Sequence, residues 1–167
     1  MVEKIIFKHA HLIDGRGGDP IPNATLVVSG SKIETVFPEE TERSVPRGKV
    51  IDLKGKTLMP GLIDAHVHPG NVMYHLHQTA ALPPAVYVHR VTKTLEMDLN
   101  LGFTTLRDAA GLDQGFRVAI DEGLIRGPRL FLSVTPLTQA DNGKEPSPRN
   151  SLGIRPENCH GPDEVRR

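Results

Sequence analysis

The sequence predicts an α/β protein in which parallel βαβ units follow an N-terminal segment of short β-strands. Residues 1–57 alternate β-branched and apolar runs with turn residues and show no helical period. After residue 58, apolar runs of strand length alternate with segments of helical period, in the order strand, helix, strand, helix, strand. The length of 167 residues suits about one domain with a real core. We therefore expect two parts, residues 1–57 and residues 58–167.

The N-terminal part is predicted to contain strands at 4–13, 24–38 and 49–61. The loop "DGRGGDP" ends the first of these runs. The second run is broken by Gly30-Ser31, which predicts a hairpin. The third contains a turn at Lys54-Gly55-Lys56. These short runs and frequent turns predict a small β-structure.

The second part opens with a strand that ends at "AHVH". Its apolar run, "TLMPGLIDAHVH", is typical of a strand that is buried on both faces. Loop residues are expected up to Leu82, and Pro84 suits the first position of a helix. That helix is predicted to end at Gly102 and to turn one face inward, with Val88, Val91, Leu95 and Leu99.

Two further strands and a helix complete the predicted pattern. Residues 103–109 and 128–134 read as strands. Between them, residues 114–122 read as a helix, stopped by Gly123, whose inward residues are Phe116, Ala119 and Ile120. Residues 139–161 carry almost no core-forming residues and predict a long irregular segment, which in a compact domain is often functional. Pro162, Asp163 and Glu164 then suit the start of a helix.

The composition excludes several classes of partner. The formal net charge is zero, so no nucleic acid or anionic membrane surface is expected as a partner. No apolar run approaches the roughly 20 residues that span a bilayer. A single cysteine, Cys159, forms no intrachain disulfide and suits a reducing compartment. We therefore expect a cytoplasmic protein.

The stretch "LMPGLIDAHVHPG" contains the strongest candidate site. On a strand, His66 and His68 project to the same face, where both imidazoles reach one metal ion. They stand at the C-terminal end of the strand, where functional groups of parallel α/β proteins gather. A pair of ordinary strand-end histidines is the alternative. Asp64 is expected on the same side as His66, where it either orients an imidazole or satisfies backbone donors.

These motifs together resemble the amidohydrolase superfamily. "PGLIDAHVH" is similar to the family's strand-1 signature, and "HLIDGRGGDPIPNATLVVSGSKIETV" to its N-terminal sandwich strands. "GFTTLRDAAG" resembles its second strand, and "GLIRGPRLFLS" its passage from helix 2 to strand 3. The combination is most similar to the imidazolonepropionase-like and prolidase-like branch.

The resemblance implies a metal-dependent hydrolase with a (β/α)8 TIM barrel. Residues 58–167 would then hold the first three βα units, and residues 1–57 part of a small β-sandwich. His66 and His68 match ligands of the more buried metal, so the expected cofactor is zinc, as one or two divalent ions. Asp108 matches a recurrent family position, with either a loop-ordering or supporting role at the site or a purely structural role. Weaker candidates, expected to be loop or surface residues, are His75, His77, His89, Cys159 and His160.

The resemblance also implies ligands that this chain does not provide. The family completes its site with a lysine or glutamate on strand 4, histidines on strands 5 and 6, and a strand-8 aspartate as general base. No catalytic residue is therefore assigned within this chain. The expected reaction is hydrolysis of an amide, cyclic amide or dipeptide, a small-molecule substrate.

Two alternatives remain open at this point. One is an inactive truncated paralogue, or one half of a split enzyme that binds a partner chain, such as the C-terminal part or a second copy. The other is a small His-x-His metal protein of cupin-like barrel fold, against which the two predicted helices argue.

Overall fold

A computed structural model describes residues 3–38, 41, 44–140, 151–154 and 156–166. The chain divides into two compact units, Met1–Pro60 and Gly61–Arg167, and each is described here by itself. No helix among the described residues has the length and apolar character to span a bilayer.

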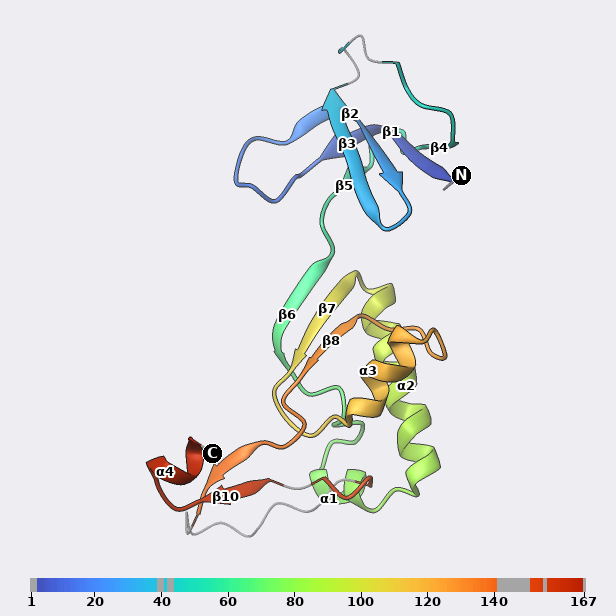
Figure 1. The fold of residues 1–167 in the computed structure, drawn as a ribbon. Helices are drawn as coiled ribbons and strands as arrows, with labels where there is room; N and C mark the ends of the chain where they lie inside the picture. The colour runs from blue at the N-terminus through green and yellow to red at the C-terminus, as the bar shows by residue number, and fades with distance from the viewer. Residues whose placement is uncertain (1–2, 39–40, 42–43, 141–150, 155, 167) are drawn as a thin grey trace. The chain divides into compact units, whose positions relative to one another are not determined.

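The first unit is built on one five-stranded sheet. Its strands are β1 (Lys4–Leu12), β2 (Ile21–Ser29), β3 (Lys32–Pro38), β4 (Lys49–Asp52) and β5 (Thr57–Leu58). The order is β3-β2-β1-β4, and β5 also pairs with β1 (Figure 1). β2 and β3 form the predicted antiparallel hairpin around Gly30-Ser31, and the predicted Lys54-Gly55 turn separates β4 from β5. The buried residues include Ile6, Ala10 and Val27.

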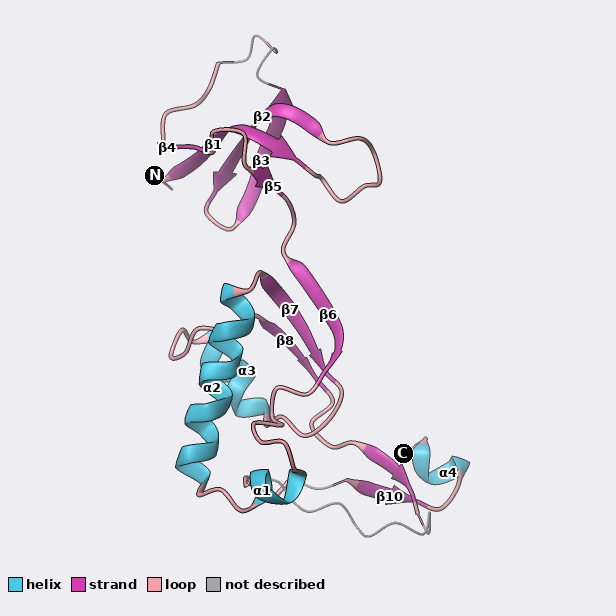
Figure 2. Cartoon of the chain, turned by 180° about the vertical axis from the view of Figure 1, so that it is seen from behind, coloured by secondary structure: helices cyan, strands magenta, loops and turns pink. Residues whose placement is uncertain are grey.

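The second unit contains a parallel three-stranded sheet covered on one side by helices. Its strands β6 (Leu62–Val67), β7 (Phe103–Asp108) and β8 (Arg129–Leu132) lie in the order β6-β7-β8. Helices α2 (Pro84–Asn100) and α3 (Gln114–Asp121) lie together on one side of this sheet, as both views show (Figures 1 and 2). The predicted βαβ order is therefore confirmed, and the all-strand cupin-like alternative is wrong.

The apolar face of α2 differs from the predicted one by one residue. Val91 and Leu95 are fully buried, as predicted, but the third core residue is Tyr87, whereas Val88 is 36% exposed. Positions 87, 91 and 95 follow each other at intervals of four, so Val88 lies about 100° around the helix from that row. The helix ends as predicted: Gly102 has a φ of 97° and its N–H donates to the Leu99 carbonyl.

The predicted burial of β6 on both faces is wrong. Leu62 is 43% and Ile63 69% exposed. The physical reason is that α2 and α3 pack on the same side of the sheet, and no described element of the second unit covers the other side. This open side of the sheet is called the open face below. On the covered side, Leu106 and Leu130 pack with Tyr87, Val91 and Phe116.

The segment after β8 is more regular than predicted. β9 (Leu137–Gln139) and β10 (Glu157–Cys159) form a parallel pair, and α4 (Pro162–Val165) begins at Pro162 as expected. The irregular stretch of the prediction includes residues 141–150 and 155, which lie outside the described residues. A short helix, α1 (Leu76–Ala80), occupies part of the loop predicted before Leu82. The Ser151 hydroxyl donates to the Thr79 carbonyl at 2.6 Å, so the segment after β8 contacts α1.

Gly61, at the start of β6, has no room for a side chain. A Cβ there would lie 2.1 Å from Thr104 Cγ2 and 2.7 Å from Thr104 Cβ on the neighbouring strand. Gly61→Ala is expected to destabilise the second unit by about 1–3 kcal/mol, because β6 and β7 must move apart. Amide hydrogen exchange of β6 and β7 measures the effect.

The matched control is Gly18→Ala, where a Cβ meets no atom within 4 Å. Thr104→Ala in the Gly61→Ala background is expected to recover part of the loss. Equal exchange rates in Gly61→Ala and the wild type would contradict the contact.

Candidate metal site

The candidate site is shaped by a register shift between β6 and β7. Asp64 pairs with Leu106, whereas Val67 pairs with Asp108, so β6 advances from 64 to 67 while β7 advances from 106 to 108. β6 therefore contains one extra residue, which is a β-bulge. Bulges of this kind redirect the side chains that follow them and are frequent beside active sites.

The bulge determines which face His66 and His68 occupy. Leu106 belongs to the core beneath α2, so its neighbour in the register, Asp64, is on the covered side. Val67 is again on the covered side, since it packs against the same core. Side chains alternate along a strand, so His66, which precedes Val67, is placed on the open face, and the His68 ring, directly after the end of β6, lies 5.3 Å from the His66 ring.

The expectation that Asp64 and His66 share a face is therefore wrong. The extra residue separates the two positions, and Asp64 lies on the side of α2. Burial, together with the negative charge of Asp64, raises the pKa of Asp98 on that helix. The Asp64 carboxylate accepts a hydrogen bond from the backbone N–H of His66 at 2.9 Å. Of the two roles expected for Asp64, orienting an imidazole or satisfying backbone donors, the structure therefore contains the second.

The two imidazoles have a spacing that suits a shared metal ion. Their ring centres lie 5.3 Å apart and the rings are inclined by 81°. Two imidazoles on one tetrahedral zinc, at Zn–N distances of about 2.0–2.1 Å, have ring centres about 5 Å apart. His66 is exposed and His68 half-buried, so both are accessible at the C-terminal end of β6. The pair therefore fits two positions of a metal site.

Asp108 is buried at the end of β7, with 1% of its surface exposed. One carboxylate oxygen accepts the Leu112 N–H at 3.0 Å, and the other has no hydrogen-bond partner among the described residues. Burial raises the pKa of the Asp108 carboxyl above its ordinary value, while the N–H groups of Leu112 and Ala110 and the charge of His68 act in the opposite direction. Asp108 thus orders the loop that follows β7, and it lies close enough to His68 to interact with its charge.

The loop after His68 packs tightly on α2. Pro69 and Gly70 are buried, and a Cβ on Gly70 would lie 2.7 Å from the Tyr87 hydroxyl oxygen. Tyr87 is buried on α2, with 1% of its surface exposed. The close approach fixes where the chain leaves the two histidines.

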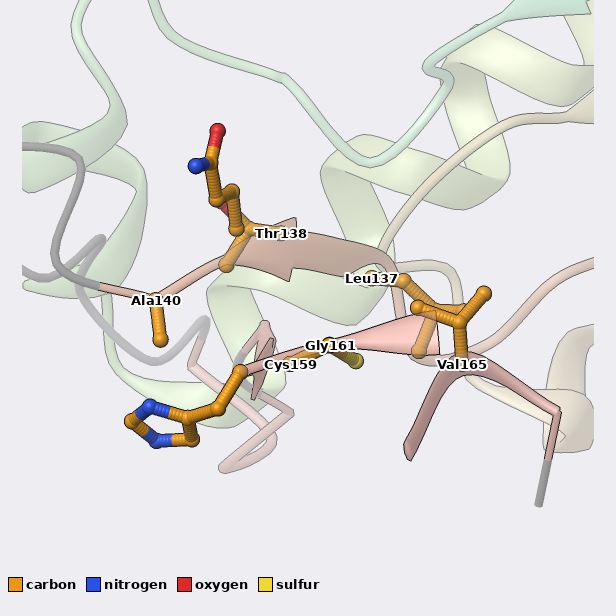
Figure 3. Close-up of a pocket in the computed structure, with 8 residues that line it drawn as sticks. Leu137, Thr138, Ala140, Cys159, Gly161 and Val165 are labelled. Carbon is orange, nitrogen blue, oxygen red and sulfur yellow. The ribbon is translucent and has the colours of Figure 1, made fainter. Parts of the chain in front are cut away.

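Two cavities of the second unit are lined by candidate site residues. One, of about 570 Å³, opens beside His66 at the ends of β7 and β8, and its lining residues are His66, Arg107, Asp108, Ala109, Arg117, Phe131, Leu132 and Ser133. The other, of about 420 Å³, is lined by β9, β10 and α4 and includes the buried Cys159 and the exposed His160 (Figure 3). The two cavities share no lining residue.

The weaker candidate ligands stay apart from the pair. His75 precedes α1 and His77 lies within it, and both are exposed, as is His89 on α2. Among the described residues, no group of three or more His, Cys, Asp or Glu side chains is arranged to hold a metal ion. Sequence reasoning missed Arg107, which lines the cavity beside His66; its position between two core-facing residues in "TLRD" is the signal that places it on the open face.

Comparison with known proteins gives one consistent relationship. Residues 49–114 match the amidohydrolase family. The chain is 32% identical over 140 residues to ochratoxinase from Aspergillus niger, covering 81% of this chain and 29% of that protein. It is 39% identical over 67 residues to imidazolonepropionase from Pseudomonas savastanoi pv. phaseolicola, covering 39% of this chain and 17% of that protein.

The solved structures agree with the sequence relatives. A prolidase complexed with N-methylphosphonate-L-proline superimposes with a TM-score of 0.81 at 29% identity, over 98% of this chain and 42% of that one. The chain thus spans less than half the length of each of these relatives. It corresponds to the N-terminal part of amidohydrolase structures.

The contact between Gly70 and Tyr87 predicts a coupled pair. Gly70→Ala is expected to destabilise the second unit by about 1–3 kcal/mol, because the new methyl group overlaps the tyrosine hydroxyl. Tyr87→Phe removes that oxygen, so the double variant is expected to be more stable than the sum of the two single changes. Urea unfolding of the four proteins yields the coupling, expected at about 0.5–3 kcal/mol; strictly additive changes would rule out the contact.

Proposed function

We propose that His66 and His68 are two metal ligands of a hydrolase of carbon–nitrogen bonds. The match of residues 49–114 to the amidohydrolase family supports the proposal. The observation that carries the proposal is the pair of imidazoles, 5.3 Å apart, at the C-terminal end of β6, the first strand of the three-stranded parallel sheet. The position is the one where α/β enzymes gather their functional groups.

The fold proposed for the whole protein is a (β/α)8 barrel with an attached β-sandwich. In this proposal β6, β7 and β8 are the first three barrel strands, and the sheet of the first unit is part of the sandwich. The superposition with a prolidase over 98% of this chain supports the assignment. The open face would then line the barrel interior, which accounts for the exposed Ile63 and Phe131.

The proposed cofactor is zinc, as one or two divalent ions. When bound, such an ion supplies Lewis-acid polarisation of a scissile carbonyl and a water of lowered pKa. His66 and His68 would bind through neutral ring nitrogens, with Asp64 holding the backbone N–H of His66. Asp108 would order the loop beside His68 through the Leu112 N–H. The remaining ligands and the general base are proposed to lie on barrel strands that this chain does not span.

The proposed substrate is a small molecule with an amide, cyclic amide or dipeptide bond. The names of the relatives, an ochratoxinase, an imidazolonepropionase and a prolidase, support this class without selecting within it. The cavity of about 570 Å³ beside His66 has the size of a small-molecule pocket.

The second candidate is a chain whose open face binds a partner polypeptide. The observation that favours it is the apolar surface on that face, where Ile63 is 69% and Phe131 57% exposed. Apolar side chains gathered on an uncovered sheet are typical of an interface. The partner would be the C-terminal part of such an enzyme or a second copy of this chain.

Replacement of either histidine tests the metal site directly. In the 167-residue chain, zinc titration followed by imidazole NMR signals is expected to shift His66 and His68 together. His66→Ala or His68→Ala is expected to abolish the zinc response of the remaining partner, since one ring nitrogen does not make a site.

The matched controls are His75→Ala and His77→Ala, which remove histidines of the same spacing, one directly before α1 and one within it. The response of His66 and His68 is expected to persist in both. Zinc shifts at His66 that survive the loss of His68 would refute the shared ion.

Sedimentation or size-exclusion measurements test the second candidate, the partner-binding open face. The chain alone is expected to self-associate as concentration rises, because its open face exposes apolar side chains. Ile63→Glu or Phe131→Glu is expected to lower the association, whereas Leu124→Glu, at a 72% exposed loop position, is not. A chain that stays monomeric at every concentration would exclude an unsatisfied interface.

A further inference from the structure

The peptide group between Ala65 and His66 is held at both of its polar ends by side chains. It lies inside the bulge, between the paired residues Asp64 and Val67. Its N–H, from His66, donates to the Asp64 carboxylate at 2.9 Å. Its carbonyl, from Ala65, accepts from Nη1 of Arg107 at 3.0 Å. Side chains on two strands thus fix the orientation of a peptide that the bulge removes from regular pairing.

Arg107 reaches this carbonyl from the open face. It stands between Leu106 and Asp108, which are buried on the covered side, so the alternation of β7 places it on the other side. It also lines the cavity beside His66. A guanidinium is a rigid, permanently charged donor, which suits it to hold one carbonyl in a fixed direction.

The charge of Arg107 alone gives no reason for its place beside metal ligands. A cation near a bound divalent ion repels it, and this repulsion weakens metal binding. Any favourable contribution of Arg107 to a metal site must therefore come through the bond that it donates. That bond ends on the peptide to which the His66 side chain is attached.

We propose that Arg107 is a positioning residue for the metal site, acting through the Ala65 carbonyl to fix the direction of the His66 imidazole. The proposal rests on the proposed function of His66 and His68 as ligands. Asp64 is its counterpart at the other end of the same peptide. Without Arg107 the peptide is held at its N–H end alone, so the direction of the His66 imidazole relative to His68 is less well fixed before any metal binds. Partners that orient metal ligands typically change metal affinity about 10- to 100-fold when they are removed.

The test compares two arginines that line the same cavity. Arg107→Met keeps the aliphatic stem and removes the donors and the charge, whereas Arg117→Met removes an equal charge from α3, beside the same cavity. Arg107→Lys keeps the charge with a different donor. Zinc alone is titrated into each 167-residue chain, and the imidazole signals of His66 and His68 give the affinity. The ¹³C shift of the Ala65 carbonyl reports the hydrogen bond in the absence of metal.

The expected result is a loss of zinc affinity of about tenfold in Arg107→Met, with a shifted Ala65 carbonyl signal. Arg117→Met is expected to bind zinc as tightly as the wild type or more tightly, because only a repelling charge is lost. Arg107→Lys is expected to fall between the wild type and Arg107→Met, and it carries the test if Arg107→Met does not fold.

Three results would overturn the proposal. The first is an unchanged zinc affinity in Arg107→Met, and the second is an equal loss of zinc affinity in Arg107→Met and Arg117→Met. The third is an Ala65 carbonyl ¹³C shift that is the same in Arg107→Met and the wild type. Failure of the proposed function looks different: the wild-type imidazoles then do not respond to zinc, while the Ala65 signal still depends on Arg107.

Discussion

The extra residue in β6 is the constraint on which the candidate site depends. In a regular strand Asp64, His66 and His68 would all share one face, and the register of Asp64 with Leu106 makes that the face packed beneath α2. Two imidazoles directed into an apolar core would lose water without gaining partners, at a cost typical of buried polar groups. The bulge returns Val67 to the core and places His66 on the open face, with the His68 ring 5.3 Å from it. One inserted residue thus reconciles an apolar packing surface with a polar site on the same strand.

The bulge is stable because the chain is fixed on either side of it. At one end, Gly61 approaches Thr104 so closely that no side chain fits between β6 and β7. At the other, Gly70 packs against the hydroxyl of Tyr87. Between these points, β7 is the one strand that pairs with β6 among the described residues, and the Ala65–His66 peptide in the bulge makes hydrogen bonds with two side chains. Asp64 and Arg107 supply them, which links the conformation of a backbone peptide to the identity of two polar residues.

The sequence predicted the elements well and the faces less well. The hairpin at Gly30-Ser31, the Pro84 helix start and the inward Val91 and Leu95 follow from local rules that tertiary contacts did not override. The bulge could not be predicted, because alternation assumes a fixed period of two and contains no signal for an added residue. The burial of β6 was overestimated for a related reason. An apolar run indicates that a strand can be buried, but it does not indicate which elements cover each face of the sheet. Helix α1 and the strands β9 and β10 are too short for any periodicity to indicate them.

Adjacent residues at the end of β7 serve opposite sides of the sheet. Asp108, on the covered side, accepts the Leu112 N–H and so orders the loop that leads to α3. Arg107, on the open face, bonds the bulge of β6. Arg107 and Asp108 therefore connect the bulge of β6 with the loop between β7 and α3, through one hydrogen bond each. For this reason the "TTLRD" segment and the "DAHVH" segment are best understood as one structural unit: the geometry of the second depends on a donor in the first. The site thus depends on two strands, although its proposed ligands lie on β6 and directly after it.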